Sequence, residues 1–183
     1  MNAFPISLNL KNRKILVVGA GKIATNKIKK LLNFTNDIVV LAPTISGVIK
    51  GFDIKTLEKE YEKKDIEGFN IVIACVDDIN LQKEIYQHTR DKNILYTCSD
   101  VLELCDFTFT SMLKKDDLII SISTNGTSPS FSKELKNYLE NIIPNSVGDF
   151  LKEMKTLRNT LPKGKSRMEL LKKKSKDFIE NWK

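Results

Sequence analysis

The sequence predicts an α/β protein in which a doubly wound parallel sheet is followed by a small β-rich segment and a helical C-terminal region. In the first half of the chain, short apolar runs alternate with amphipathic segments of helix length, which is the order of a parallel sheet with crossover helices. Two β-rich runs then follow one another without a helix between them. The last third has apolar residues at helical spacing. At 183 residues, the chain is long enough to bury one core and to add an extension.

The doubly wound sheet is expected within residues 1–105. A strand, a helix and a second strand form its first unit, at Lys14–Gly19, Lys22–Asn33 and Asp37–Pro43. Later elements are a helix at Asn80–Lys92 and strands at Phe52–Leu57, Asn70–Val76 and Asn93–Thr97. The run NIVIACV is continuously apolar, as in a strand that is buried on both faces. This order predicts a Rossmann-like nucleotide domain.

A β-hairpin is expected next. Its two strands lie on either side of the polar turn Lys114-Lys115-Asp116, at Asp106–Leu113 and Asp117–Thr124. The second strand alternates isoleucine with serine over residues 120–123, so one of its faces is apolar and needs cover, which another subunit could supply. We assign residues 106–145 to this hairpin and the helix after it, and expect them to mediate dimerisation.

Three helices are expected after the hairpin. The first has Pro129 at its first position, behind an N-cap at Ser128 or Thr127, and Pro144 ends it. The second follows Pro144, and the third begins at Ser166, where Glu169 completes a capping box. Residues 146–183 are therefore predicted to be a C-terminal helical region. The apolar stripes of these helices are interpreted as core and interface positions.

A glycine-rich turn joins the first strand to the first helix. Gly19, Gly21 and Ala24 have the GxGxxA spacing of a dinucleotide-binding turn. Gly19 permits the tight turn, Gly21 lets the backbone approach a pyrophosphate, and the small Ala24 allows the helix to pack closely on the strand. The phosphates would bind the free N–H groups at the positive end of the helix. The alternative is a glycine turn without a ligand in an ordinary α/β protein.

Composition narrows the cellular setting. No run approaches the roughly 20 apolar residues of a membrane span, and the first residues lack the order of a signal peptide. We therefore expect a cytoplasmic protein that does not act at a membrane. Cys75, Cys98 and Cys105 are odd in number and have no CxxC spacing, which favours reduced thiols over disulfides. Since His88 is the single histidine, no metal site is expected, and His88 is interpreted as a surface or packing residue.

The positive charge of the chain is concentrated at its C-terminal end. The formal net charge is +7, and residues 163–183 hold eight Lys or Arg against three acids. A solvated helix face explains most such runs, and attraction of a polyanionic small substrate is another explanation. No RNA-binding motif, zinc finger or helix-turn-helix is recognisable, so nucleic acid is not expected as a partner.

Five short motifs follow one another along the chain. They are Phe4–Leu8 (FPISL), Val17–Ala24 (VVGAGKIA) with Lys27 behind it, Val39–Pro43 (VVLAP), Ala74–Asp78 (ACVDD) and Ser123–Pro129 (STNGTSP). In this order and spacing, the chain resembles the precorrin-2 dehydrogenases and the N-terminal dehydrogenase module of siroheme synthase over most of its length. The resemblance implies NAD-dependent oxidation of precorrin-2, a tetrapyrrole with many carboxylates, to sirohydrochlorin in siroheme biosynthesis. It also implies a homodimer joined through the central β segment. Some members of this family also insert Fe²⁺, so a bifunctional dehydrogenase and ferrochelatase is the alternative.

The resemblance implies that NAD is the cofactor. The residues that it places at the phosphate turn, at the adenosine side and after the fourth strand are Lys22 and Ile23, Pro43 and Thr44, and Val76 and Asp77. The second strand ends without the acid that usually binds the ribose hydroxyls, and Asp37 lies at the wrong end of that strand. No basic residue stands there to hold a 2′-phosphate, so the preference for NAD over NADP rests on the resemblance.

Asp100 is the expected catalytic residue. It follows the carboxyl end of a strand, where open α/β sheets bind ligands, and it matches the Asp that the family places beside its tetrapyrrole. A positioned carboxylate could accept the proton that is lost on dehydrogenation, or the pyrrole protons during metal insertion. The alternative is that Asp100 only caps the next turn.

A cluster of hydroxyl and amide side chains precedes the helix at Pro129. Because a helix N-terminus attracts carboxylates, we assign substrate binding to this cluster, which is Ser123, Thr124, Asn125, Gly126 and Thr127. Thr124 and Asn125 are expected to contact the substrate, and Ser128 to cap the helix. Some relatives have a His after the Pro that ends this helix, whereas this chain has Asn145-Ser146, which argues against metal insertion.

A nucleotide-sensing module without turnover is the competing class of function, since the fold alone does not choose between a sensor and an enzyme. The long extension beyond Asp100 exceeds what a minimal sensor needs. The sequence therefore favours an enzyme.

Overall fold

The computed structural model describes residues 3–182, and the chain forms two compact units, Met1–Phe109 and Thr110–Lys183. We call them the sheet unit and the helical unit. The sheet unit extends past the predicted boundary at residue 105 because Phe107 and Phe109 pack against the core of the sheet.

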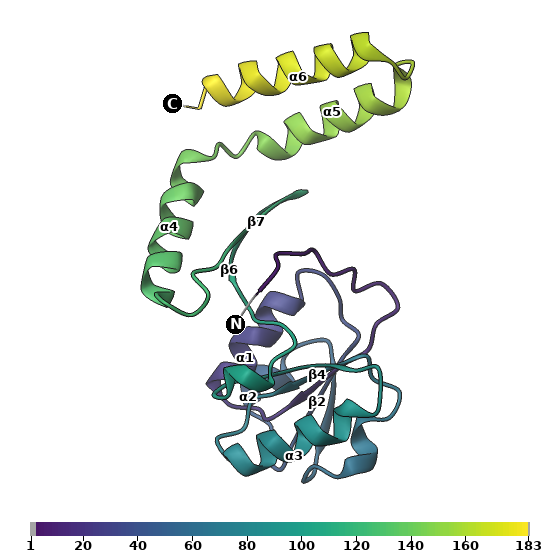
Figure 1. Cartoon of the computed structure of the whole chain (residues 1–183), viewed down its shortest axis with the longest axis vertical. Helices are drawn as coiled ribbons and strands as arrows, with labels where there is room; N and C mark the ends of the chain where they lie inside the picture. The colour runs from purple at the N-terminus through teal and green to yellow at the C-terminus, as the bar shows by residue number, and fades with distance from the viewer. Residues whose placement is uncertain (1–2, 183) are drawn as a thin grey trace. The chain divides into compact units, whose positions relative to one another are not determined.

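The sheet unit, in which Figure 1 labels β2 and β4, is a five-stranded parallel sheet with the order β3-β2-β1-β4-β5. Its strands are β1 (Ile15–Val18), β2 (Ile38–Ala42), β3 (Lys55–Glu58), β4 (Ile71–Ala74) and β5 (Leu95–Cys98). Its helices are α1 (Lys22–Leu31), α2 (Gly47–Lys50) and α3 (Ile79–Arg90), and two short 3-10 turns are η1 (Lys63–Ile66) and η2 (Leu102–Leu104). The predicted Rossmann-like sheet is confirmed, and α2 and η1 are additions that the sequence analysis did not foresee.

Side chains of the central strands alternate between two cores, one on each face of the sheet. Val17 of β1 packs in the same cluster as Ala24 and Ile28 of α1. Val18 faces the other side and shares a cluster with Ile85 of α3. Because every residue of β1 and β4 is buried, these strands are apolar throughout, which is the pattern that made them recognisable in the sequence.

The helical unit consists of an antiparallel hairpin and three helices. Its elements are β6 (Ser111–Lys115), β7 (Leu118–Ile122), α4 (Pro129–Ile142), α5 (Val147–Thr160) and α6 (Lys165–Glu180). One cluster contains Leu113 of the hairpin, Leu139 of α4, Val147 of α5 and Phe178 of α6. The predicted segments 106–145 and 146–183 therefore share a core.

Two local predictions in the helical unit were wrong. The hairpin turn is Asp116-Asp117, and both lysines of the predicted turn are paired in β6. Asp116 has a φ of 50°, a left-handed conformation that tight turns use and that Asp tolerates. The predicted capping box of α6 does not form, because Gly164 is the N-cap and Ser166 already lies inside the helix.

The apolar face of the hairpin is covered within the helical unit itself. Ile120 packs against the cluster around Leu113 and Val147, so this chain's own helices supply cover that another subunit could also have supplied. Exposed apolar side chains lie elsewhere on the unit. Ile119 on the opposite face of β7 is 49% exposed, and on α4 Phe131 and Tyr138 are 60% and 61% exposed.

Asp106 ties the end of the sheet unit to β5. Its carboxylate accepts two hydrogen bonds from Arg90, at 2.8 and 3.0 Å, and one from the Tyr96 N–H at 2.8 Å. Burial raises the pKa of Asp106, but the hydrogen bonds from Arg90 and Tyr96 outweigh burial and hold the pKa below its ordinary value.

We expect Asp106→Asn to lower the free energy of unfolding by about 1–3 kcal/mol at neutral pH, because charge-assisted hydrogen bonds to a half-buried group are lost. A group with a depressed folded-state pKa stabilises above its ordinary pKa, and this contribution is lost as the pH falls through the folded-state value. Urea unfolding at neutral and acidic pH measures the difference, which should shrink toward acid. The exposed Asp53→Asn is the control; an equal loss there, or a loss independent of pH, would contradict the role given to Asp106.

Candidate functional site

The carboxyl ends of four strands lie in register at one edge of the sheet, which we call the carboxyl edge. Val18 at the end of β1 pairs with Leu41 of β2 and with Ala74 of β4, and Ala74 pairs with Cys98 of β5. The segments that follow these strands contain the GxGxxA turn, Pro43-Thr44, Val76-Asp77 and Asp100. The structure thus brings the predicted cofactor residues and the predicted catalytic residue to one edge of the sheet unit.

Gly19 is required by the protein itself. Its φ is 105°, in the region that favours glycine, and a Cβ there would collide with the carbonyl group of Cys75 at the end of β4. Its N–H donates to Leu41 O at 2.8 Å. The turn after β1 is therefore packed directly on the end of β4.

Gly21 has no such internal requirement. It is the N-cap of α1 with a φ of −81°, and nothing lies within 4 Å of the position that its Cβ would take. Neither backbone conformation nor packing within the sheet unit explains a glycine here. A ligand that approaches the backbone closely would explain the glycine. This is also the reason that the dinucleotide fingerprint has a glycine at this place.

The N-terminus of α1 is suited to receive an anion. No side chain caps it, and no acidic residue lies in its first turn. Lys22 and Ile23 are exposed beside it, whereas Ala24 is fully buried against the sheet. Unsatisfied N–H groups, the positive end of the helix dipole and a nearby ammonium group fit the pyrophosphate of a dinucleotide.

At the end of β2, Pro43 and Thr44 are exposed and no carboxylate follows the strand. The basic residue Lys59 is tied to the end of this strand, because its backbone N–H donates to Ala42 O at 3.1 Å. Its ammonium group is bound to Glu62 and Asp65 at 2.7 and 3.0 Å. A 2′-phosphate would have to compete with these acids for Lys59.

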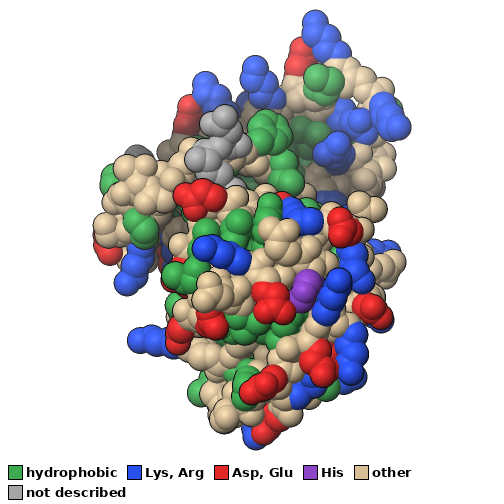
Figure 2. All heavy atoms as spheres, turned by 60° about the horizontal axis from the view of Figure 1, so that its bottom comes forward, with side chains coloured by type: hydrophobic (Ala, Val, Ile, Leu, Met, Phe, Trp, Pro, Cys, Tyr) green, Lys and Arg blue, Asp and Glu red, His purple; other side chains and the backbone are tan. Residues whose placement is uncertain are grey.

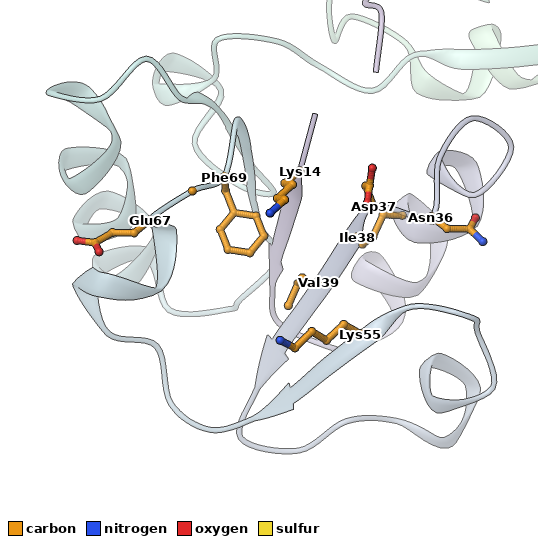
Figure 3. A pocket seen from close by; sticks show the side chains of 9 residues that line it. Lys14, Asn36, Asp37, Ile38, Val39, Lys55, Glu67 and Phe69 are labelled. Atoms are coloured by element: carbon orange, nitrogen blue, oxygen red, sulfur yellow. The ribbon is translucent and has the colours of Figure 1, made fainter. Parts of the chain in front are cut away.

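Asp37 lies at the opposite edge of the sheet, as its place before β2 predicts. It lines a cavity of about 350 Å³ at the amino ends of the strands, together with Lys14, Lys55, Glu67 and Phe69 (Figure 3). Because this cavity and the GxGxxA turn lie at opposite ends of the strands, the cavity is separate from the cofactor residues.

Asp100 is exposed at the carboxyl edge, and Gln82 of α3 holds its side chain. Gln82 Nε2 donates to Asp100 Oδ2 at 2.6 Å and to Val76 O at 2.7 Å. Asp78 caps α3 and thereby fixes the start of the helix that carries Gln82, because its Oδ1 accepts from Asn80 N at 2.8 Å. The side chain of Asp77 remains exposed.

The sequence analysis missed two polar residues near this edge. Gln82 is fully buried, and Ser46, the N-cap of α2, has a buried Oγ without a hydrogen-bond partner among residues 3–182. A polar residue in step with Ile85 and Thr89, on the buried face of α3, was the signal for Gln82. The sequence offered no comparable signal for Ser46.

Cys75 lies near Asp100 at the carboxyl edge and has no evident chemical role. Burial raises the pKa of its thiol, and the nearby Lys27 opposes this only in part. A thiol with a raised pKa stays protonated at neutral pH, which makes it a packing residue rather than a nucleophile.

The predicted substrate-binding cluster belongs to the helical unit and is part of a tight turn. Asn125 and Gly126 have φ values of 51° and 84°, and the Thr127 N–H donates to Thr124 O at 3.0 Å. Thr124 Oγ1 accepts from the Ser128 N–H at 3.0 Å. Ser123, Asn125, Gly126 and Thr127 are exposed, so their groups are accessible to a ligand.

Ser128 caps α4, as predicted. Its Oγ accepts from the Phe131 N–H at 3.3 Å, and Pro129 occupies the first helical position.

His88 is a packing residue of α3. Its Nδ1 lies 3.0 Å from Tyr61 Oη, and the two rings stack with centroids 5.9 Å apart.

Among residues 3–182, no three His, Cys, Asp or Glu side chains are grouped to hold a metal ion. Within the same range no helix has the length and apolar character needed to cross a bilayer. On the face in Figure 2, Lys and Arg side chains are interspersed with Asp and Glu.

A family model and several known proteins match the chain. Residues 6–111 match the family model described as "Putative NAD(P)-binding". The siroheme synthase of Psychrobacter cryohalolentis is 34% identical over 156 residues, which is 83% of this chain and 30% of that protein. The siroheme synthase of Buchnera aphidicola is 31% identical over 83% of this chain and 33% of that protein. The chain thus spans about a third of the length of these relatives.

The chain is also similar to a solved structure along nearly its full length. That structure is titled "SirC, precorrin-2 dehydrogenase" and superposes with a TM-score of 0.81 at 27% sequence identity. The superposition covers 98% of this chain and 92% of that chain. Both units are therefore included in the likeness.

Proposed function

Because the chain belongs to the NAD(P)-binding family whose model matches residues 6–111, we propose that it is an NAD-dependent dehydrogenase that oxidises precorrin-2 to sirohydrochlorin in siroheme biosynthesis. The observation that carries the proposal is the TM-score of 0.81 to a solved precorrin-2 dehydrogenase over nearly the full length of both chains. The open Gly21 and the uncapped start of α1 support the cofactor part of it.

NAD, when bound, supplies the hydride acceptor. Precorrin-2 loses two hydrogens in the reaction, one as a hydride and one as a proton, so the protein has to orient the substrate and receive the proton. Gly19, Gly21 and the first turn of α1, including Lys22, Ile23 and Ala24, would hold the pyrophosphate. Val76 and Asp77 would border the cofactor at the end of β4, next to Asp100.

Asp100 is the group that we assign to the proton. Its Oδ2 is occupied by Gln82, while the side chain is exposed at the carboxyl edge, so Oδ1 is accessible to a substrate C–H or N–H. The hydroxyl and amide groups of Ser123–Thr127, exposed except for the half-buried Thr124, would contact carboxylates of the tetrapyrrole, with Thr124 and Asn125 as the main contacts.

We infer NAD rather than NADP because Lys59, the basic group tied to the end of β2, is held by two acids. Pro43 and Thr44 would lie against the adenosine. The three cysteines are free thiols in the structure, which supports a cytoplasmic location, where thiols remain reduced.

Anaerobic incubation of the protein with precorrin-2 and NAD tests the proposal. We expect NADH and the sirohydrochlorin spectrum to appear together, with a lower kcat/KM when NADP replaces NAD. Binding of NAD without any NADH formation would contradict the enzyme and support the sensing module. A second arm supplies sirohydrochlorin with Fe²⁺ or Co²⁺. A metal-insertion rate close to the dehydrogenase rate would replace the single activity by the bifunctional alternative.

We also propose that the protein is a homodimer joined through the helical unit. The exposed apolar residues Phe131, Tyr138 and Ile142 lie on one face of α4, and Ile119 is exposed on the hairpin. Large exposed apolar side chains at helical spacing are typical of an interface.

Tyr138→Lys should convert the dimer to monomers at micromolar concentration, because an ammonium group would be buried in the apolar contact. Sedimentation velocity measures the change. Glu134→Lys places the same ammonium group at another exposed position of the same helix and should leave the dimer intact. A parent protein that is already monomeric would contradict the dimer.

A further inference from the structure

Gln82 is a buried polar residue whose two side-chain hydrogen bonds both lead to the carboxyl edge. Its side chain is 0% exposed, on the face of α3 that also buries Ile85 and Thr89. Its Nε2 bridges Val76 O and Asp100 Oδ2, at 2.7 and 2.6 Å. Its Oε1 is buried and has no hydrogen-bond partner in the described part of the chain.

Packing alone does not explain an amide at this position. A buried acceptor without a partner destabilises a fold, and an apolar side chain of similar volume would avoid that loss. What an apolar side chain cannot do is connect the backbone after β4 with the side chain that follows β5. The amide donates to both, and it does so without adding a charge beside the carboxylate.

We propose that Gln82 is a positioning residue, which acts through Asp100 by holding the carboxylate at a fixed place relative to the backbone that would border the cofactor. The inference rests on the proposed function and adds the residue that orients its proton acceptor. Asp100 is exposed, and without Gln82 its side chain would exchange between rotamers. With Oδ2 bound, Oδ1 is held at one place, and misplacing a catalytic group lowers the rate steeply.

A double-mutant cycle tests this coupling. The variants are Gln82→Met, Asp100→Ala and the two combined, and Gln87→Met is the control, an exposed glutamine of the same helix. The readouts are kcat at saturating precorrin-2 and NAD, the Kd for NAD, and the thermal midpoint. We expect Gln82→Met to lower kcat about tenfold to a hundredfold, with an unchanged Kd for NAD. In the Asp100→Ala background, the same substitution should have no further effect on kcat.

Stability and activity should respond differently in this experiment. Gln82→Met removes the unpartnered Oε1 and also removes the donor to Val76 O, and these two effects on stability oppose each other. Its thermal midpoint should therefore lie close to that of the parent protein, although its kcat falls. Gln87→Met should change neither. If Gln82→Met does not fold, Gln82→Asn takes its place in the cycle, because the shorter amide cannot span both acceptors.

Two outcomes would overturn the inference. One is a fall in kcat of equal size in the parent and the Asp100→Ala background, which would mean that Gln82 does not act through Asp100. The other is a kcat of Gln82→Met equal to that of the parent. Failure of the proposed function looks different, because then the parent protein itself forms no NADH from precorrin-2.

Discussion

Gly21→Asp should abolish NAD binding and leave the protein folded. Nothing in the sheet unit contacts the position of the new Cβ, and the backbone there is open to any residue. Aspartate is also a favoured N-cap, so the new carboxylate would bind the free N–H groups of α1 that a pyrophosphate needs. Repulsion between two charges about 4 Å apart costs about 4 kcal/mol at the effective dielectric constant of a protein surface, or roughly a thousandfold in Kd.

Calorimetric titration with NAD measures this loss, and the thermal midpoint shows whether the fold is kept. Gly164→Asp is a matched control, since Gly164 is also a helix N-cap with open space around it, in the helical unit. It should bind NAD as the parent does. An affinity of Gly21→Asp close to that of the parent would remove the phosphate-binding role from this turn.

Asp100→Ala should lower the rate of precorrin-2 dehydrogenation by about a hundredfold or more, which is the scale of a lost general base. The fold should be unaffected, because Asp100 is exposed and Gln82 keeps its bond to Val76 O. Any metal insertion that the parent performs should disappear, since the pyrrole protons then have no acceptor. Some NADH should still form, because orientation beside the cofactor contributes without the carboxylate.

Single-turnover measurement of NADH formation separates this chemistry from binding. Asp100→Asn keeps the shape and an acceptor for Gln82 but cannot take a proton, so it should be as slow as Asp100→Ala. Glu103→Gln removes a nearby exposed carboxylate and should retain the parent rate. Full activity of Asp100→Asn would show that the residue only caps the turn.

The sheet unit was largely predictable because local sequence patterns indicate the order of its strands and helices. β1 and β4 are buried on both faces and therefore continuously apolar, and α1 follows a glycine turn of known spacing. The edge where the site lies follows from this order, since parallel strands present their carboxyl ends together. The roles of the residues at that edge stay predictions.

What the sequence did not reveal depends on contacts between distant segments. Gln82 is an ordinary helix residue until α3 packs on the sheet and brings it to Asp100, 18 positions away. The sequence left open whether a second subunit covers the apolar face that carries Ile120, because only the folded unit shows that its own helices pack there. The predicted capping box of α6 does not form for a local reason, because the helix begins at Lys165, one residue before Ser166.

The strand order also sets the distance between the two ends of the candidate site along the carboxyl edge. β2 and β5 are separated by β1 and β4, so Thr44 and Asp100 follow strands that lie three inter-strand spacings apart, about 14 Å. Only an elongated ligand contacts both ends of this edge. The two halves of a dinucleotide then behave as linked ligands, in which binding of one half raises the effective concentration of the other. A single nucleotide has no such second half, and its affinity for either end falls accordingly.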